Sequence, residues 1–221
     1  MNFKIFNIPV TVKWSFWILS LLIGSNFARQ TNGRTALPIL ASFVGILFVS
    51  ILIHELGHAL WARWYGMTPS IEIHLFGGTA RYTGTKQLTH GQNLMISLAG
   101  PVSNILLAGL SFIFILFLAY LNVGVNDKIL SMIVFINLFL GIFNLLPLYP
   151  MDGGYALNAG LKKWKGPTGA KLSYQISFIM ALAFASLSFY TGNSIMALML
   201  GYFAFLSYKM IKSPESTLHF H

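Results

Sequence analysis

The chain has 221 residues, of which 56% are hydrophobic and only 9% are charged. Soluble domains carry about 25% charged residues, so this composition excludes an ordinary soluble domain and indicates an integral membrane protein. The absence of cysteine excludes a disulfide framework and a thiolate metal site. A net charge of +9 is typical of basic cytoplasmic loops in a membrane protein, so we do not expect nucleic-acid binding.

Six apolar segments, each near the ~20 residues that cross a bilayer, follow one another along the chain. Lys4 and Lys13 precede the first segment as in a signal peptide, but no small-residue cleavage site follows, so we expect a retained helix. The sequence therefore predicts an all-α polytopic membrane protein with about six transmembrane helices. The segments lie at about 14–28, 38–64, 93–121, 129–148, 172–190 and 193–211.

The distribution of Lys and Arg predicts the orientation of these segments. If the N-terminus is cytoplasmic, 11 of the 14 Lys and Arg residues fall on the cytoplasmic side, and the other three are Arg29, Arg34 and Lys128. Because cytoplasmic loops carry an excess of Lys and Arg, we expect both termini to be cytoplasmic. The second segment then runs from the outer side to the inner side.

The second segment contains the pattern H-E-L-G-H at 54–58. On a helix, this pattern places His54 and His58 on one face, where they can bind zinc, and it places Glu55 beside the metal as a general base. Polar groups at membrane depth are costly and mark functional sites. The pattern therefore predicts a hydrolytic metal centre in the cytoplasmic half of a membrane helix.

A catalytic zinc site needs a third protein ligand, and the chain has only five acidic residues. Glu55 is the base, Asp127 falls in an outer loop, Glu215 lies in the C-terminal tail, and Glu72 is expected to face water. Asp152 follows the fourth segment within N-L-L-P-L-Y-P-M-D-G-G, where two prolines interrupt the helix and two glycines allow tight turning. We therefore predict Asp152 as the third ligand.

Three of the remaining polar positions stay open to alternatives. His74 and His90 could replace Asp152 as the third ligand. Asn144, one turn before Pro147, could donate to an oxyanion or satisfy the carbonyls that the proline frees.

Three polar residues of the third and fourth segments are expected to serve packing. We expect Ser103 and Asn104, which follow Gly100 and Pro101, to permit close helix packing, and Asn137 to form a hydrogen bond between helices. We assign no role to His219 and His221 in the tail.

A small β-hairpin is predicted between the second and third helices. Residues 71–76 alternate between apolar and polar types, Gly77 and Gly78 are expected to form the turn, and 79–83 form the second strand. We expect the hairpin to be associated with the membrane. Its open edge, including Phe76, Gly77 and Gly78, could pair with an extended substrate peptide, or the hairpin could simply link two helices.

These motifs resemble those of the site-2 protease family of intramembrane zinc metalloproteases. H-E-x-x-H is joined here by N-x-x-P-x-x-x-x-D-G from Asn144 to Gly153, by a G-x-x-x-N element from Gly100 to Asn104, and by Phe76-Gly77-Gly78. The resemblance covers roughly 5–155 and corresponds to the compact prokaryotic form without a PDZ or CBS domain.

The resemblance implies one zinc ion per chain, bound by His54, His58 and Asp152, with Glu55 as the general base. It also implies transmembrane-helix substrates cut in regulated intramembrane proteolysis, and a location in a prokaryotic cell membrane. We expect a single protease domain over 1–221, with a catalytic core at about 36–155 and a C-terminal helical hairpin at about 170–211. The alternatives are a zinc-binding or zinc-transport membrane protein and a catalytically inactive relative.

Overall fold

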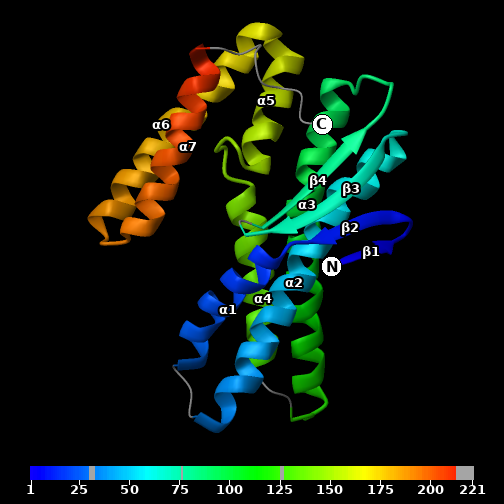
Figure 1. The fold of residues 1–221 in the computed structure, drawn as a ribbon, viewed down its shortest axis with the longest axis vertical. Helices are drawn as coiled ribbons and strands as arrows, with labels where there is room; N and C mark the ends of the chain where they lie inside the picture. Colours follow the sequence, from blue (N-terminus) through cyan, green and yellow to red (C-terminus); the bar gives the residue numbers. More distant parts are fainter. Residues whose placement is uncertain (30–32, 76, 125–126, 213–221) are drawn as a thin grey trace. The chain divides into compact units, whose positions relative to one another are not determined.

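A computed structural model describes residues 1–29, 33–75, 77–124 and 127–212. Figure 1 shows the arrangement of its helices and strands. The chain divides into two compact units, one formed by Met1–Gly84 and Ala99–Ile142 and the other by Thr85–Leu98 and Phe143–His221. The elements in chain order are β1 (Asn2–Ile5), β2 (Ile8–Val12), α1 (Trp14–Arg29), α2 (Gly33–Trp64), β3 (Thr68–His74), β4 (Gly77–Thr83), α3 (His90–Tyr120), α4 (Asp127–Asn144), α5 (Asp152–Lys165), α6 (Pro167–Tyr190) and α7 (Ser194–Lys212).

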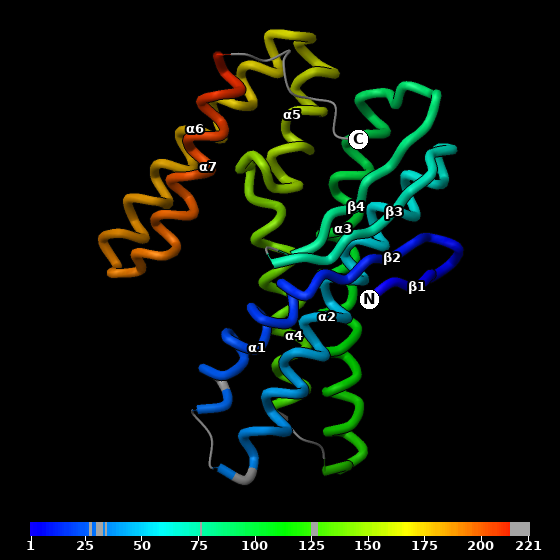
Figure 2. The backbone as a smooth tube through the Cα atoms, viewed as in Figure 1, coloured from blue at the N-terminus to red at the C-terminus, as the bar shows by residue number. Residues whose placement is uncertain are grey.

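The first unit contains a four-stranded sheet in the order β1-β2-β3-β4 (Figure 2). The outer pairs are antiparallel, whereas β2 and β3 are parallel, with Val10 opposite Ile71. Alternate side chains of β2 and β3 point to one face, where Ile8, Val10 and Ile73 are almost completely buried. They pack with apolar residues of α1 and α2 to form the core of this unit.

The sequence did not predict β1 and β2. The two strands are joined at Phe6 and Asn7, which both have positive φ angles of 49° and 61°. Positive φ at both central residues is typical of the turn that matches the twist of a two-residue hairpin. The side chain of Arg63, in the last turn of α2, donates a hydrogen bond to the carbonyl of Phe6 and ties this turn to the helix. Lys4 therefore lies within β1 and Lys13 directly follows β2, so they are not simply the charged lead to a membrane segment.

The predicted Gly-Gly turn is wrong. Gly77 and Gly78 lie inside β4, where they pair with His74 and Ile73 of β3. Phe76, one of the residues that could pair with a substrate peptide, lies outside the described residues. The physical reason for a glycine at 78 is a close approach of the strand to α2, because a Cβ atom at this position would overlap the side chain of Glu55.

Four of the described helices, namely α2, α3, α6 and α7, are long and apolar enough to cross a membrane. The apolar side chains of α3 at Leu110, Ile113 and Phe117 are exposed. Exposed apolar surface of this kind suits lipid. The protein is therefore an integral membrane protein that is mostly helical. Two further segments expected to span are shorter, since α1 has 16 residues and α4 has 18.

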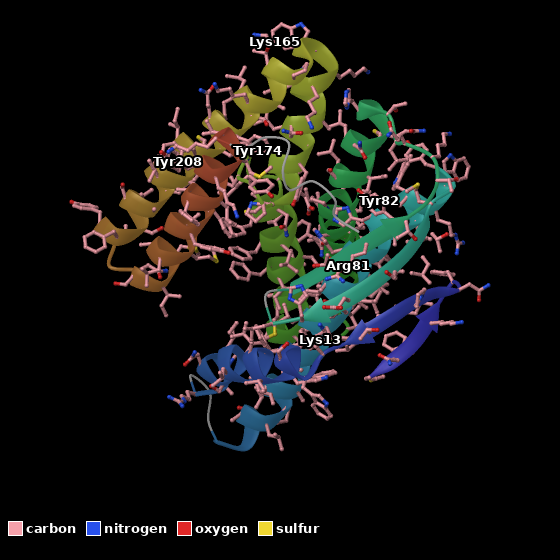
Figure 3. All side chains as sticks on the ribbon, turned by 45° about the horizontal axis from the view of Figure 1, so that its top comes forward. Lys13, Arg81, Tyr82, Lys165, Tyr174 and Tyr208 are labelled. Carbon is pink, nitrogen blue, oxygen red and sulfur yellow. The ribbon has the colours of Figure 1, made fainter. Side chains whose placement is uncertain are left out.

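The second unit contains α5, α6 and α7 together with Thr85–Leu98, which includes the start of α3. Figure 2 shows α6 and α7 as an antiparallel pair. Small buried residues at Ser173, Ser177, Ala181 and Ala204 let the helices approach closely. Lys165, Tyr174 and Tyr208 mark α5, α6 and α7 in Figure 3.

The sequence did not predict α5, which is too short and polar to span a membrane. Its end carries a recognisable signal, because Lys162, Lys163 and Lys165 in the last turn are followed by Gly166 and Pro167. Gly166 has a positive φ of 60° and Pro167 opens α6. Basic residues, then glycine, then proline is the usual order at a helix end.

Candidate metal centre

His54 and His58 lie one turn apart on α2, and both are buried. Their Nε2 atoms face each other at 3.2 Å, and the two rings are nearly perpendicular, at 75°. Two ligands of a tetrahedral ion with bonds of ~2.0–2.1 Å lie about 3.3–3.4 Å apart. The helix therefore brings two imidazole nitrogens to the separation that a shared zinc ion requires.

Gly100 of α3 borders the space between the two imidazoles. A Cβ atom at this position would overlap Nε2 of His58, and it would lie 2.6 Å from Cε1 of the same ring and 2.8 Å from Nε2 of His54. The space beside both ligand nitrogens is therefore one that a side chain would fill and that the glycine leaves open. Together with the donor set, this space fits a zinc ion.

Asn104 lies one turn beyond Gly100 on α3 and contacts His54 directly. Its Oδ1 accepts a hydrogen bond from Nδ1 of His54 at 2.6 Å, and its Nδ2 donates to Oδ1 of Asn137 on α4 at 2.7 Å. The predicted helix–helix hydrogen bond of Asn137 is confirmed. The expectation that Asn104 serves helix packing was incomplete, because the same side chain also holds His54, a candidate metal ligand. Gly100 and Asn104 share one helix face at i and i+4, and this spacing is the signal that the sequence offered.

Glu55 is buried beside the histidines, at 5% exposure. The edge strand β4 crosses it so closely that a Cβ atom at Gly78 would lie 2.5 Å from Oε1 of Glu55. Only a glycine can occupy this point of the strand without displacing the carboxylate. The arrangement places a general-base candidate directly beneath β4, the last strand of the described sheet.

Glu72 and His74 of β3 each have a polar side chain as a neighbour within or beside the sheet. Nζ of Lys13 lies 2.8 Å from Oε1 of Glu72, and this hydrogen bond holds the pKa of the Glu72 carboxyl below its ordinary value. Nε2 of His74 lies 3.0 Å from Oγ1 of Thr79, and burial lowers the pKa of the His74 imidazole. Figure 3 shows Lys13 where β2 leads into α1 and Arg81 on β4.

Asp152 and Asn144 belong to the second unit. Asn144 is the last residue of α4, so the helix ends before Pro147 as the sequence predicts. Asp152 is the first residue of α5. A Cβ atom at Gly153 would overlap the carbonyl oxygens of Leu145 and Leu146. The glycine after Asp152 therefore lets the start of α5 pack against the backbone of Leu145 and Leu146, which follow the end of α4.

The remaining candidates are spread along the chain. His90 is exposed at the start of α3, and Asp127 is the first residue of α4. Glu215, His219 and His221 lie outside the described residues.

Comparison with known families gives a match over most of the chain. The model of peptidase family M50 matches residues 42–127 and 119–185. The chain belongs to peptidase family M50. The M50 match spans the H-E-x-x-H pattern as well as Asp152, and it confirms the resemblance to site-2 proteases.

Individual M50 relatives agree with this assignment. The chain is 30% identical over 188 residues to the zinc metalloprotease MJ0392 of Methanocaldococcus jannaschii. The aligned region covers 81% of this chain and 52% of the relative. The chain is 32% identical over 170 residues to a putative zinc metalloprotease, sll0528, of Synechocystis, covering 71% of this chain and 42% of the relative. The chain spans about half the length of these curated relatives.

A solved structure has the same fold. The site-2 protease from Methanocaldococcus jannaschii is similar to this chain with a TM-score of 0.66 and 28% sequence identity. The similarity covers 100% of this chain and 99% of that one. The fold of this M50 member is therefore that of a site-2 protease.

Proposed function

We propose that this protein is an intramembrane zinc metalloprotease of the site-2 type, which hydrolyses peptide bonds in or near the transmembrane helices of its substrates. The observation that carries the proposal is the pair of converging Nε2 atoms of His54 and His58, 3.2 Å apart, with Glu55 adjacent to them on α2. Membership of family M50 and the names of the relatives support the same reaction.

His54, His58 and Asp152 would hold the zinc ion, and a two-histidine, one-carboxylate set is a usual ligand set for catalytic zinc. When bound, zinc polarises the scissile carbonyl and lowers the pKa of its water. Glu55 accepts a proton from the attacking water and delivers it to the leaving amine. Asn144, at the end of α4, either donates to the oxyanion or satisfies carbonyls near Pro147.

The substrate would be a transmembrane protein whose helix unwinds locally before cleavage, because a helix keeps its carbonyls in internal hydrogen bonds. The edge strand β4 would hold the unwound segment, since an extended peptide can add to an open sheet edge as a further strand. Gly78 lies on this edge directly over Glu55. A segment paired there would pass close to the general base.

The setting of the reaction is part of the proposal. We propose six membrane spans, with both termini and the metal centre on the cytoplasmic side of a prokaryotic cell membrane, and with the hairpin of β3 and β4 associated with the bilayer. The excess of Lys and Arg in the predicted cytoplasmic segments supports this orientation. The whole chain would act as one protease domain in regulated intramembrane proteolysis.

Cleavage is tested with the variant Glu55→Gln, which keeps the size of the side chain but cannot accept the proton. Candidate single-span membrane proteins are co-expressed with the wild-type chain or the variant, and their fragments are compared. We expect cleavage to fall about 10²–10⁴-fold, the usual contribution of a general base, while zinc stays bound. Identical fragments with both proteins, or a purified wild-type protein without zinc, would contradict the proposal. Zinc bound without any Glu55-dependent cleavage would favour the zinc-binding or transport alternative.

The third ligand is tested by comparing three substitutions. Asp152→Asn removes the carboxylate charge with little change of shape, so we expect loss of zinc measured by metal analysis of the purified protein. His74→Gln and His90→Gln are the matched controls and should retain zinc. If Asp152→Asn retained zinc and one of the histidine variants lost it, that histidine would be the third ligand.

A further inference from the structure

We propose that Asn104 and Asn137 form an amide relay that fixes which nitrogen of His54 faces the metal. Asn104 is then a positioning residue for the metal centre, acting from the opposite side of the imidazole. The inference rests on the proposed zinc site and assigns a purpose to two asparagines buried between apolar helices. Every residue of the relay belongs to the first compact unit.

The relay begins at Asn137 on α4, which is completely buried. Its Nδ2 donates to the carbonyl oxygen of Ile133, one turn earlier on the same helix, at 2.8 Å. Because only the amide nitrogen can donate to a carbonyl, this bond turns Oδ1 of Asn137 away from Ile133. The Oδ1 atom then accepts from Nδ2 of Asn104 at 2.7 Å.

Asn104 is oriented by two acceptors at once. Its Nδ2 donates to the carbonyl oxygen of Ser50 at 3.1 Å as well as to Asn137. A rotated amide would place the Asn104 oxygen against two other oxygens, with no hydrogen between them, at a site that is 0% exposed. The structure therefore determines that Oδ1 of Asn104 faces Nδ1 of His54.

This orientation determines the proton position on His54. An amide oxygen cannot donate, so Nδ1 of His54 must carry the hydrogen of the 2.6 Å bond. In a neutral imidazole the lone pair then lies on Nε2, the atom that faces His58 and the space left by Gly100. A ligand histidine usually donates its second N–H to such a partner, and the bond fixes the tautomer and the orientation of the ring.

The test compares zinc affinity in three variants, measured on purified protein by competition with a chelator. Asn104→Leu keeps the approximate size but removes the acceptor, and we expect zinc affinity to fall about 10–100-fold, as for loss of an outer-shell partner. Asn104→Asp keeps an oxygen for Nδ1, but its second oxygen would meet the carbonyl oxygen of Ser50 and Oδ1 of Asn137 with no hydrogen between them, so this variant should recover only part of the affinity. Asn158→Leu is the matched control, because this buried asparagine binds Ser173 within the second unit.

A second readout separates positioning from packing. The pH midpoint of zinc binding should shift in Asn104→Leu and stay in place in Asn158→Leu, because only the former removes the hydrogen-bond partner of His54. In wild-type protein labelled with ¹⁵N-histidine, the nitrogen signals of His54 should show a protonated Nδ1 without requiring any variant to fold. Equal zinc affinity and pH midpoint in wild type and Asn104→Leu, or a protonated Nε2 on His54, would overturn the relay alone. A wild-type protein that binds no zinc would refute the proposed function as well.

Discussion

Gly100→Ala tests whether the space between the two imidazoles is the metal position. The added methyl group would lie 2.6 Å from Cε1 of His58, whereas ordinary contact begins at 3.4 Å. The ring must therefore retreat by at least about 0.8 Å, several times the roughly 0.2 Å by which ligand distances in a metal site vary. The methyl group would also lie 2.8 Å from Nε2 of His54, so moving a single ring does not restore the space.

The expected result is a large loss of zinc affinity in a protein that still folds. Loss of an outer-shell partner already costs 10–100-fold, so displacement of a ligand should cost more than about 100-fold, or about 2.8 kcal/mol. The backbone should tolerate the change, because Gly→Ala in a helix interior is favourable by about 1 kcal/mol. The measurements are chelator competition for zinc and thermal unfolding of the metal-free protein.

Gly109→Ala is the matched control on the same helix. Apart from its chain neighbours and the backbone of its own helix, no atom lies within 4 Å of a Cβ atom at this position, so the substitution carries the same helix-propensity change without touching the histidines. Zinc affinity in Gly109→Ala should equal that of the wild type. If Gly100→Ala bound zinc as tightly as Gly109→Ala, the assignment of this space to the metal would be refuted.

Two further predictions concern close contacts of α2. Gly78→Ala should displace Glu55 and reduce substrate cleavage about 100-fold, since a 1 Å misplacement of a reacting group can cost that much. Zinc affinity should stay unchanged. Unchanged cleavage would show that β4 can move away. Gly57→Ala should destabilise the fold by about 1–3 kcal/mol in thermal or denaturant unfolding, as overpacking does, because its Cβ atom would lie 2.7 Å from a backbone carbonyl of α3. Gly45→Ala, with nothing within 4 Å of its Cβ atom, is the control, and equal stability of the two variants would contradict the packing argument.

The candidate site was predictable from sequence where its geometry is local. His54 and His58 converge because residues at i and i+4 share one helix face, whatever packs around them. The end of α4 before Pro147 was predictable for a similar reason, since proline opposes helix continuation. Asp152 was nominated because the chain contains few acidic residues, and its role as a ligand remains a prediction.

The sheet shows where local patterns were insufficient. Gly77 and Gly78 look like a turn, yet they lie within β4 because the strand must pass close to Glu55. The pairing of β2 with β3 joins Val10 to Ile71 across the whole of α1 and α2. Short alternating strands contain no information about so distant a partner, so β1 and β2 were missed.

The sequence by itself determined a membrane protein with a two-histidine metal motif and a nearby general base, because hydrophobic length and helix periodicity act within one segment. The tertiary structure decided what surrounds that motif. The hydrogen bond from His54 to Asn104 joins residues 50 positions apart, and the glycines at 78 and 100 come from a strand and a helix that follow it in the chain. These contacts depend on how α2, α3, α4 and β4 pack, and packing between distant segments is not encoded in the spacing of any one of them.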